Sequence, residues 1–287
     1  MERDFFRRLV EELASSQIVI RRFDIMLVME HCFNIDWRIH HKTETVSTNL
    51  DARGGRHGDV FTADCQTAGR GRLDHRWLSP PGVNLMMSAV LSVEELPPEQ
   101  VATLPLVAGL AVSRGLSLFL PRGLSPLIKW PNDVLVDGRK IAGILCERHD
   151  DLVIIGIGVN VDQEEFAREI AEKATSIALI AKKFEAGHHG RAGSSVGETR
   201  SVTSVRGEIL RELDECYCLW RAKGFGAIHP LIADIDFLCG RNVSVRQADG
   251  DPFPILGRSH GVMPDGSLDV GGTRIYAGEA HVEKILV

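Results

Sequence analysis

Three β-prone segments follow one another between residues 133 and 161 with only short turns between them. They cover residues 133–136, 140–147 and 152–161. Asp137-Gly138 is a strong signal for a two-residue hairpin, and Asp150-Asp151 supplies the second turn. Parallel neighbours need a crossover of a dozen or more residues, so these segments are expected to pair antiparallel. The chain therefore predicts a mixed α/β fold of the α+β kind on a largely antiparallel sheet, which argues against a Rossmann or P-loop fold.

The remaining pattern predicts one large domain followed by a small one. Further strands are expected at residues 37–46, 59–65, 83–91 and 127–130, and helices at residues 2–13, from 98 onward with a kink or break at Pro105, at 164–173 and at 202–220. Short strands split by glycine turns predict a small, partly open β-barrel after residue 240. We expect an N-terminal helical extension at 1–36, a large domain at 37–236 with a mobile insertion at about 184–200, and a C-terminal domain at 237–287.

Composition narrows the classes of function. The 287 residues carry a formal net charge of −6, so no global basic field points to DNA, and no apolar run is long enough to span a membrane. The six cysteines are scattered without a metal or redox spacing, as expected of reduced thiols, and the first residues lack a signal-peptide layout. A cytoplasmic protein is expected. His188-His189 has no evident third ligand, so no metal site of the protein itself is predicted.

A glycine- and arginine-rich segment lies between two of the expected strands. It reads Gln66-Thr67-Ala68-Gly69-Arg70-Gly71-Arg72 and continues through Trp77 to Pro81. Glycines let a backbone approach a ligand closely, and guanidinium groups fit phosphate or carboxylate. The segment could fold over an anion, or it could be a solvated basic turn.

Three other segments offer polar groups for the same ligand. Ser47-Thr48-Asn49 is either a plain helix N-cap or an N-cap that also binds a polar ligand head. Lys129, between Ile128 and Trp130 in Lys129-Trp130-Pro131-Asn132-Asp133, is either a lysine that protects an edge strand or a fixed positive charge for an anionic reacting centre. Gly156-Ile157-Gly158-Val159-Asn160 ends a buried strand in small residues and an amide.

The order of these motifs resembles that of the biotin protein ligase family. The resemblance covers about residues 40–180 and also includes Trp77-x-Ser79-Pro80, Lys140-Ile141-Ala142-Gly143-Ile144-Leu145 and Ala174-Thr175-Ser176. It implies a catalytic fold like that of class II aminoacyl-tRNA synthetases and a C-terminal SH3-like barrel. It also implies a two-step reaction, in which biotin and ATP give biotinyl-5′-AMP and pyrophosphate before biotin passes to a lysine of a biotin carboxyl-carrier domain, as in acetyl-CoA carboxylase.

The resemblance also assigns roles to residues. Lys129 and Arg72 are the expected catalytic residues. The expected biotin-binding residues are Ser47, Thr48, Asn49, Gln66, Arg70, Gly71, Arg72, Lys129 and Gly143. The expected ATP- and adenylate-binding residues are Arg70, Arg72, Trp77, Asn132, Lys140 and Asn160. Mg²⁺ is expected to accompany ATP.

The chain departs from the family pattern in its loop, where Leu73-Asp74-His75-Arg76 replaces further arginines and glycines. An acid there opposes phosphate binding unless it pairs with a neighbouring arginine. The alternatives are a lipoate- or octanoate-type ligase on the same fold and a non-catalytic ligand sensor. A homodimer is one of the assemblies open to such a ligase, whereas a DNA-binding repressor role is not expected.

Overall fold

The computed structural model describes residues 35–73, 75–187, 200–247 and 253–283. These residues form two β-sheets, and the larger one has the strand order β1-β2-β3-β7-β6-β5-β4. Its strands are β1 (Arg38–Thr45), β2 (Asp59–Gln66), β3 (Leu85–Ser92), β4 (Leu127–Lys129), β5 (Asp133–Val136), β6 (Arg139–His149) and β7 (Leu152–Val159). β1 and β2 pair parallel, and the other neighbours pair antiparallel. The mixed, largely antiparallel sheet and the β5–β6–β7 meander are thus confirmed.

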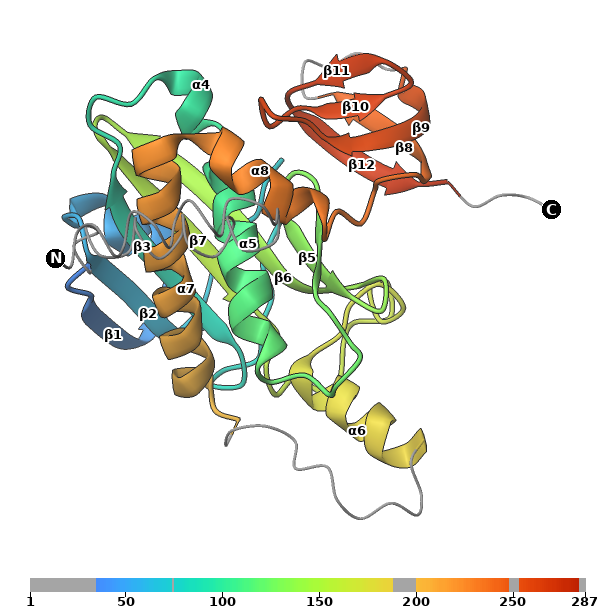
Figure 1. Cartoon of the computed structure of the whole chain (residues 1–287). Coiled ribbons are helices and arrows are strands. Elements are labelled where there is room, and N and C mark those ends of the chain that lie inside the picture. Colours follow the sequence, from blue (N-terminus) through green and yellow to red (C-terminus); the bar gives the residue numbers. More distant parts are fainter. Residues whose placement is uncertain (1–34, 74, 188–199, 248–252, 284–287) are drawn as a thin grey trace, which may run out of the picture.

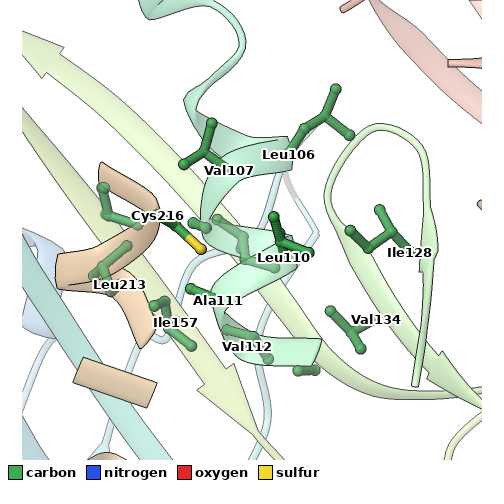
Figure 2. Close-up of a cluster of buried hydrophobic side chains, with 14 of the residues drawn as sticks. Leu106, Val107, Leu110, Ala111, Val112, Ile128, Val134, Ile157, Leu213 and Cys216 are labelled. Carbon is green, nitrogen blue, oxygen red and sulfur yellow. The ribbon is translucent and has the colours of Figure 1, made fainter. Parts of the chain in front are cut away.

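Helices cover one face of this sheet (Figure 1). The main ones are α5 (Leu104–Ser117) and α7 (Val202–Lys223), which pack against each other, and α8 (Phe225–Ala233) follows α7. The short α4 (Pro98–Val101) precedes α5, and Pro105 stands in the first turn of α5, so the expected break is confirmed. Figure 2 shows the core between α5, α7 and the sheet, with Leu110, Val112, Leu213 and Ile157 among its buried side chains.

Strand alternation gives the opposite face of the sheet its character. Ile155, Ile157 and Val159 of β7 belong to the core under the helices. Successive side chains of a strand point to opposite faces, so Gly156 and Gly158 lie on the other face. Gly156 pairs in register with Ser88 of β3, and Gly158 pairs with Gly143 of β6. Small and polar residues therefore line the centre of the face opposite α5 and α7.

A second, five-stranded antiparallel sheet follows α8 (Figure 1). Its order is β11-β10-β9-β8-β12, formed by β8 (Asn242–Gln247), β9 (Ile255–Val262), β10 (Leu268–Val270), β11 (Thr273–Ile275) and β12 (Gly278–Val282). The indole N–H of Trp130 donates to the carbonyl of Gly266 at 3.2 Å, and Asp236 accepts the backbone N–H of Val262 at 2.7 Å. These bonds attach the small sheet beside the β4 end of the large one.

The prediction of a helix at residues 164–173 is wrong. Residues 168–173 form turns, and the helix that exists is α6 (Ile177–Gly187). The backbone N–H of Lys140 donates to Lys173 and that of Thr175 donates to Lys140, so this segment pairs with the start of β6 instead of coiling. Ser176 accepts the N–H of Leu179 at 3.1 Å and so caps α6.

Two predictions concern residues that the structure does not describe. The expected N-terminal extension lies outside the described residues up to position 34, and so does the helix expected at 2–13. Of the insertion expected at 184–200, the first four residues belong to α6, whereas 188–199, with His188-His189, lie outside the described residues. Asp74 is also outside them. Among the helices that are described, none is long and apolar enough to cross a membrane.

Candidate active site

The segment Ser47-Thr48-Asn49 begins the short helix α3 (Thr48–Asp51), which continues as a turn of 3-10 helix at Ala52–Gly54. Ser47 occupies the N-cap position with an extended backbone, yet its side chain makes no capping hydrogen bond. The cap comes from Gln66 at the end of β2, whose Oε1 accepts the Thr48 N–H at 2.8 Å and lies 3.1 Å from the Thr48 hydroxyl. Gln66 thus joins the two polar segments expected to bind biotin and leaves the Ser47 hydroxyl outside the cap.

Asn49 is hydrogen-bonded to groups from two strands. Its Oδ1 accepts from the Ser88 hydroxyl of β3 at 2.6 Å, and its Nδ2 donates to Oε2 of Glu147 on β6 at 2.7 Å. A Cβ on Gly156 of β7 would collide with Oδ1 of Asn49. The glycine at position 156 therefore makes room for Asn49, and the hydrogen bonds fix the orientation of its amide.

The glycine- and arginine-rich loop folds back on itself as a small hairpin. Gly71 N–H donates to the carbonyl of His75 at 2.7 Å, and Trp77 N–H donates to that of Gly69 at 3.0 Å. A Cβ on Gly69 would collide with the carbonyl oxygen of Trp77, so this glycine permits the close approach of the two arms. The loop connects β2 to β3, as predicted, and its glycines serve the hairpin itself.

The hairpin lays Trp77 across the glycines of β6 and β7. A Cβ on Gly158 would lie 2.5 Å from the indole ring, and one on Gly143 would lie 3.3 Å from it. The ammonium of Lys140 stands 5.9 Å from the ring centroid. The Trp77 indole N–H is buried, and the described residues offer it no hydrogen-bond acceptor. An unsatisfied buried donor costs about 1–3 kcal/mol, so a ligand acceptor that reached this N–H would relieve that cost.

Arg72 and Lys129 bring positive charge to the same region. Arg72 Nη1 donates to Asn132 Oδ1 at 3.3 Å, and Asn132 in turn donates to the carbonyl of Ile144 at 2.7 Å. Burial lowers the pKa of both Arg72 and Lys129, and the carboxylates of Asp133 and Glu279 oppose that shift. Such a desolvated cation interacts strongly with an anion, because little water screens it.

The alternative that Lys129 protects an exposed edge does not fit the backbone. β4 ends the order of the large sheet, but Ile128 exchanges backbone hydrogen bonds of 2.8 Å with Ile235 and Phe237. This segment covers the edge of β4, and Lys129 is itself half-buried. A protecting charge is not needed where the edge is covered.

Two further residues expected to bind nucleotide have partners within the protein. Lys140 forms an ion pair with Asp133 at 2.6 Å. Asn160 is buried, and its Nδ2 donates to the carbonyl of Thr175 at 3.0 Å. Asn160 thus connects the end of β7 to the segment before α6. Its contact with a ligand stays a prediction.

The small sheet reaches the loop through the first residues of β12. Arg72 Nη1 donates to the carbonyl of Gly278 at 3.2 Å, and His75 Nε2 lies 3.8 Å from a carboxylate oxygen of Glu279. Glu279 also influences the pKa of Lys129. The two sheets therefore both contribute groups around the predicted catalytic residues.

The structure brings most of the predicted residues together on the face of the sheet opposite the helices. The polar group Thr48, Asn49 and Gln66 lies at one side, and Trp77, Lys140 and Arg72 lie toward β5 and β12. Sequence reasoning missed Ser88, Glu147 and Glu279. The register opposite Gly156 could have indicated Ser88, but no local pattern marks the two acids.

Comparison with known proteins agrees with this geometry. Residues 38–162 match the biotin/lipoate A/B protein ligase family. The chain is 31% identical over 252 residues to a biotin–[acetyl-CoA-carboxylase] ligase of Mycobacterium tuberculosis, covering 83% of this chain and 86% of the relative. It is 30% identical over 251 residues to the bifunctional ligase/repressor BirA of Bacillus subtilis, covering 84% and 71%.

A solved structure gives the same picture. The biotin protein ligase of Aquifex aeolicus in complex with biotin and ATP superposes with a TM-score of 0.69 at 28% identity, covering 86% of this chain and 99% of that one. The large sheet with its polar, cationic face defines a ligase catalytic domain of this type. The chain belongs to the biotin/lipoate A/B protein ligase family.

Proposed function

We propose that this chain joins biotin to protein in two steps driven by ATP. The biotin carboxylate attacks the α-phosphate of ATP, giving biotinyl-5′-AMP and releasing pyrophosphate. The amine of an acceptor lysine then attacks the activated carbonyl and displaces AMP. The observation that carries the proposal is that a hydrogen-bonded cluster of polar side chains and the cations Arg72 and Lys140 lie on one face of the sheet, beside the arginine-rich loop. Membership of the family and its biotin-ligase relatives support it.

The polar pocket suits the ureido ring of biotin. Thr48 and Gln66 already share a hydrogen bond, so little conformational freedom remains to be lost when a ring binds beside them. Ser47 is buried beside them with its hydroxyl outside the helix cap. We assign Ser47, Thr48, Asn49 and Gln66 to this ring because amide and hydroxyl groups match its donors and acceptors.

The cations suit the reacting carboxylate and the phosphates. Lys129 and Arg72 stand where burial strengthens their interaction with an anion, and an anion bound beside them would in turn favour their charged forms. We assign to them the charge that develops when the carboxylate attacks the α-phosphate. Trp77, Lys140 and Asn132 form the proposed nucleotide side next to these two cations. There the buried Trp77 N–H has no hydrogen-bond acceptor among the described residues.

The hairpin from Gly69 to Trp77 supplies the cover. A mixed anhydride such as biotinyl-5′-AMP hydrolyses readily, so exclusion of water favours transfer over loss. Arg70 and Gly71 lie in this hairpin and complete the residues we assign to biotin, together with Gly143. Gly143 acts indirectly in this arrangement, because a Cβ there would meet Lys140 and Trp77 at 3.0 and 3.3 Å.

Mg²⁺ fits as an ion carried by the phosphates of ATP. The described residues contain no group of three or more His, Cys, Asp or Glu side chains that could hold a metal, and Asp133 is paired with Lys140. Mg²⁺ commonly binds through substrate phosphates and few carboxylates. The proposed acceptor is the carboxyl-carrier domain of a biotin-dependent carboxylase, and the proposed location of the reaction is the cytoplasm.

We also propose that the catalytic domain begins at residue 37 and ends at residue 236, where the C-terminal domain follows. The C-terminal sheet would be an SH3-like barrel, supported by its five short antiparallel strands. A lipoate- or octanoate-type ligase is less favoured, because the tails of those acids offer no partner for the amides and hydroxyls of the pocket. A non-catalytic sensor would have no use for a desolvated Lys129 facing the nucleotide side.

The test is the substrate dependence of pyrophosphate release. The purified chain is mixed with ATP and Mg²⁺, and biotin, lipoate or octanoate is added at equal concentrations. We expect release with biotin and at most a few per cent of that rate with either other acid. Equal or faster release with lipoate or octanoate would assign the pocket to the other branch of the family, and no release with any acid would favour the sensor.

A further inference from the structure

Glu147 joins two segments that the proposed function assigns to different parts of the ligand. Its Oε2 accepts from Asn49 Nδ2 at 2.7 Å, and its Oε1 accepts from Arg70 Nη1 at 2.8 Å. Asn49 belongs to the helix that starts the biotin pocket, whereas Arg70 belongs to the covering hairpin. The two are separated from Glu147 by 98 and 77 residues in the chain.

The carboxylate of Glu147 projects from a strand of the large sheet. Glu147 lies in β6 opposite Ile154 of β7, whereas β5 pairs only with residues 139–143 of β6. The Glu147 side chain is only 19% exposed, whereas that of Arg70 is 43% exposed. Arg53 adds a second cation at 4.0 Å from the same Oε1. The better-buried acid therefore anchors the more exposed arginine.

The partner on the pocket side is held equally firmly. Asn49 has its Oδ1 bonded to Ser88, and its Nδ2 donates to Glu147 at 2.7 Å and, more weakly, to the carbonyl of Leu145 at 3.5 Å. Gly156 leaves no spare room around that amide. Changing the acid at 147 would therefore disturb Asn49 as well as Arg70.

We propose that Glu147 is a positioning residue that couples the biotin pocket to closure of the arginine hairpin. One carboxylate oxygen orients Asn49 toward the ring of biotin, and the other holds Arg70 in the position that covers the bound biotin. The inference rests on the proposed function and deepens it by naming the group through which pocket and cover act together. In this proposal Glu147 acts through Asn49 and Arg70, the side chains that it contacts.

The expected effect is on binding of biotin more than on the chemical step. Glu147→Gln keeps the size of the side chain but loses its charge and turns one acceptor into a donor that faces Asn49 or Arg70. Hydrogen bonds to charged groups contribute strongly, yet exposure of Arg70 reduces the share of that pair. We expect KM for biotin to rise about tenfold, with kcat for pyrophosphate release and KM for ATP changed less than about threefold.

Three further variants separate positioning from simple folding. Glu147→Asp keeps the charge but is one methylene shorter, so it should restore part of the biotin KM. Arg70→Gln combined with Glu147→Gln should raise KM by less than the product of the two single effects, because both remove the same contact. Glu44→Gln, an exposed acid on β1, is the matched control and should behave as the wild type.

The outcomes are distinct. A biotin KM within twofold of wild type in Glu147→Gln would overturn the inference, as would a fall in kcat at unchanged KM together with a lowered melting temperature. Should Glu147→Gln fail to fold, Glu147→Asp and Arg70→Gln decide, since a biotin KM unchanged in both would equally overturn it. Absence of biotin-dependent pyrophosphate release from the wild type would instead contradict the proposed function.

Discussion

Gly156 and Gly158 lie two residues apart on β7 and face the same side, but they make room for different side chains. A methyl group at position 158 would lie 2.5 Å from the ring of Trp77, whereas one at 156 would meet the amide of Asn49. In our account Trp77 belongs to the nucleotide side and Asn49 to the biotin side. Adding one methyl group at each position should therefore separate the two substrates.

The size of the effect follows from the contact distance. Ordinary contact begins at 3.4 Å, so Gly158→Ala forces the Trp77 ring to withdraw by about 0.9 Å. Overpacking of this kind costs about 1–3 kcal/mol of stability. A misplacement near 1 Å can cost about a hundredfold in rate, so we expect kcat/KM for ATP to fall about 10- to 100-fold. Gly156→Ala should instead raise KM for biotin by a similar factor.

The assay is initial-rate pyrophosphate release with ATP varied at saturating biotin and then the reverse. Gly207→Ala is the control, because a Cβ there meets nothing within 4 Å in helix α7. It should leave both KM values unchanged and stabilise the fold by about 0.5–1 kcal/mol. If Gly158→Ala shifts the biotin KM as much as Gly156→Ala does, or leaves kcat/KM for ATP within twofold, the division of the site into two sides is wrong.

Three further predictions follow from the site and the sheet. Lys129→Ala should slow biotin-dependent pyrophosphate release about 10²–10³-fold at unchanged melting temperature, and a rate within threefold of wild type would contradict a catalytic role of Lys129. Protease cleavage between residues 67 and 81 should decrease when biotin and ATP are added, whereas equal cleavage with and without them would argue against closure of the hairpin. Burial alone would raise the pKa of Asp59, but hydrogen bonds from the Arg56 N–H, His40 and Arg38 lower it to about 2. Because this folded-state pKa lies below the ordinary value of 3.8, Asp59 should stabilise the fold above pH 4 and lose that contribution between pH 4 and 2; Asp59→Asn should flatten urea-unfolding free energies across that window, and an unchanged slope would refute the assignment.

Local signals predicted much of the fold. The Asp137-Gly138 turn fixed the pairing of β5 with β6, and the apolar face of Val205, Ile209, Leu213 and Cys216 predicted α7, where all four are buried. The helix expected at 164–173 failed because its backbone pairs with Lys140, a contact that no local pattern of charge or hydropathy reveals. The true helix begins only after Ser176.

The site was predictable where its residues are consecutive in the chain. The segments around Thr48, Arg70 and Lys129 were found as motifs, and the structure places them on one face. Glu147 and Glu279 were missed because an acid on a strand looks like any solvated residue until its partner is known. Those partners lie 98 residues from Glu147, at Asn49, and 204 residues from Glu279, at His75.

Covalent transfer of biotin to a carrier domain tests the central claim most directly. The purified chain, ATP, Mg²⁺ and biotin are incubated with the carboxyl-carrier domain of a biotin-dependent carboxylase, and the intact mass of that domain is followed. We predict the gain of one biotinyl group, lost when the acceptor lysine is changed to arginine and nearly lost with Lys129→Ala. A carrier domain of unchanged mass in the presence of all four components would contradict the account.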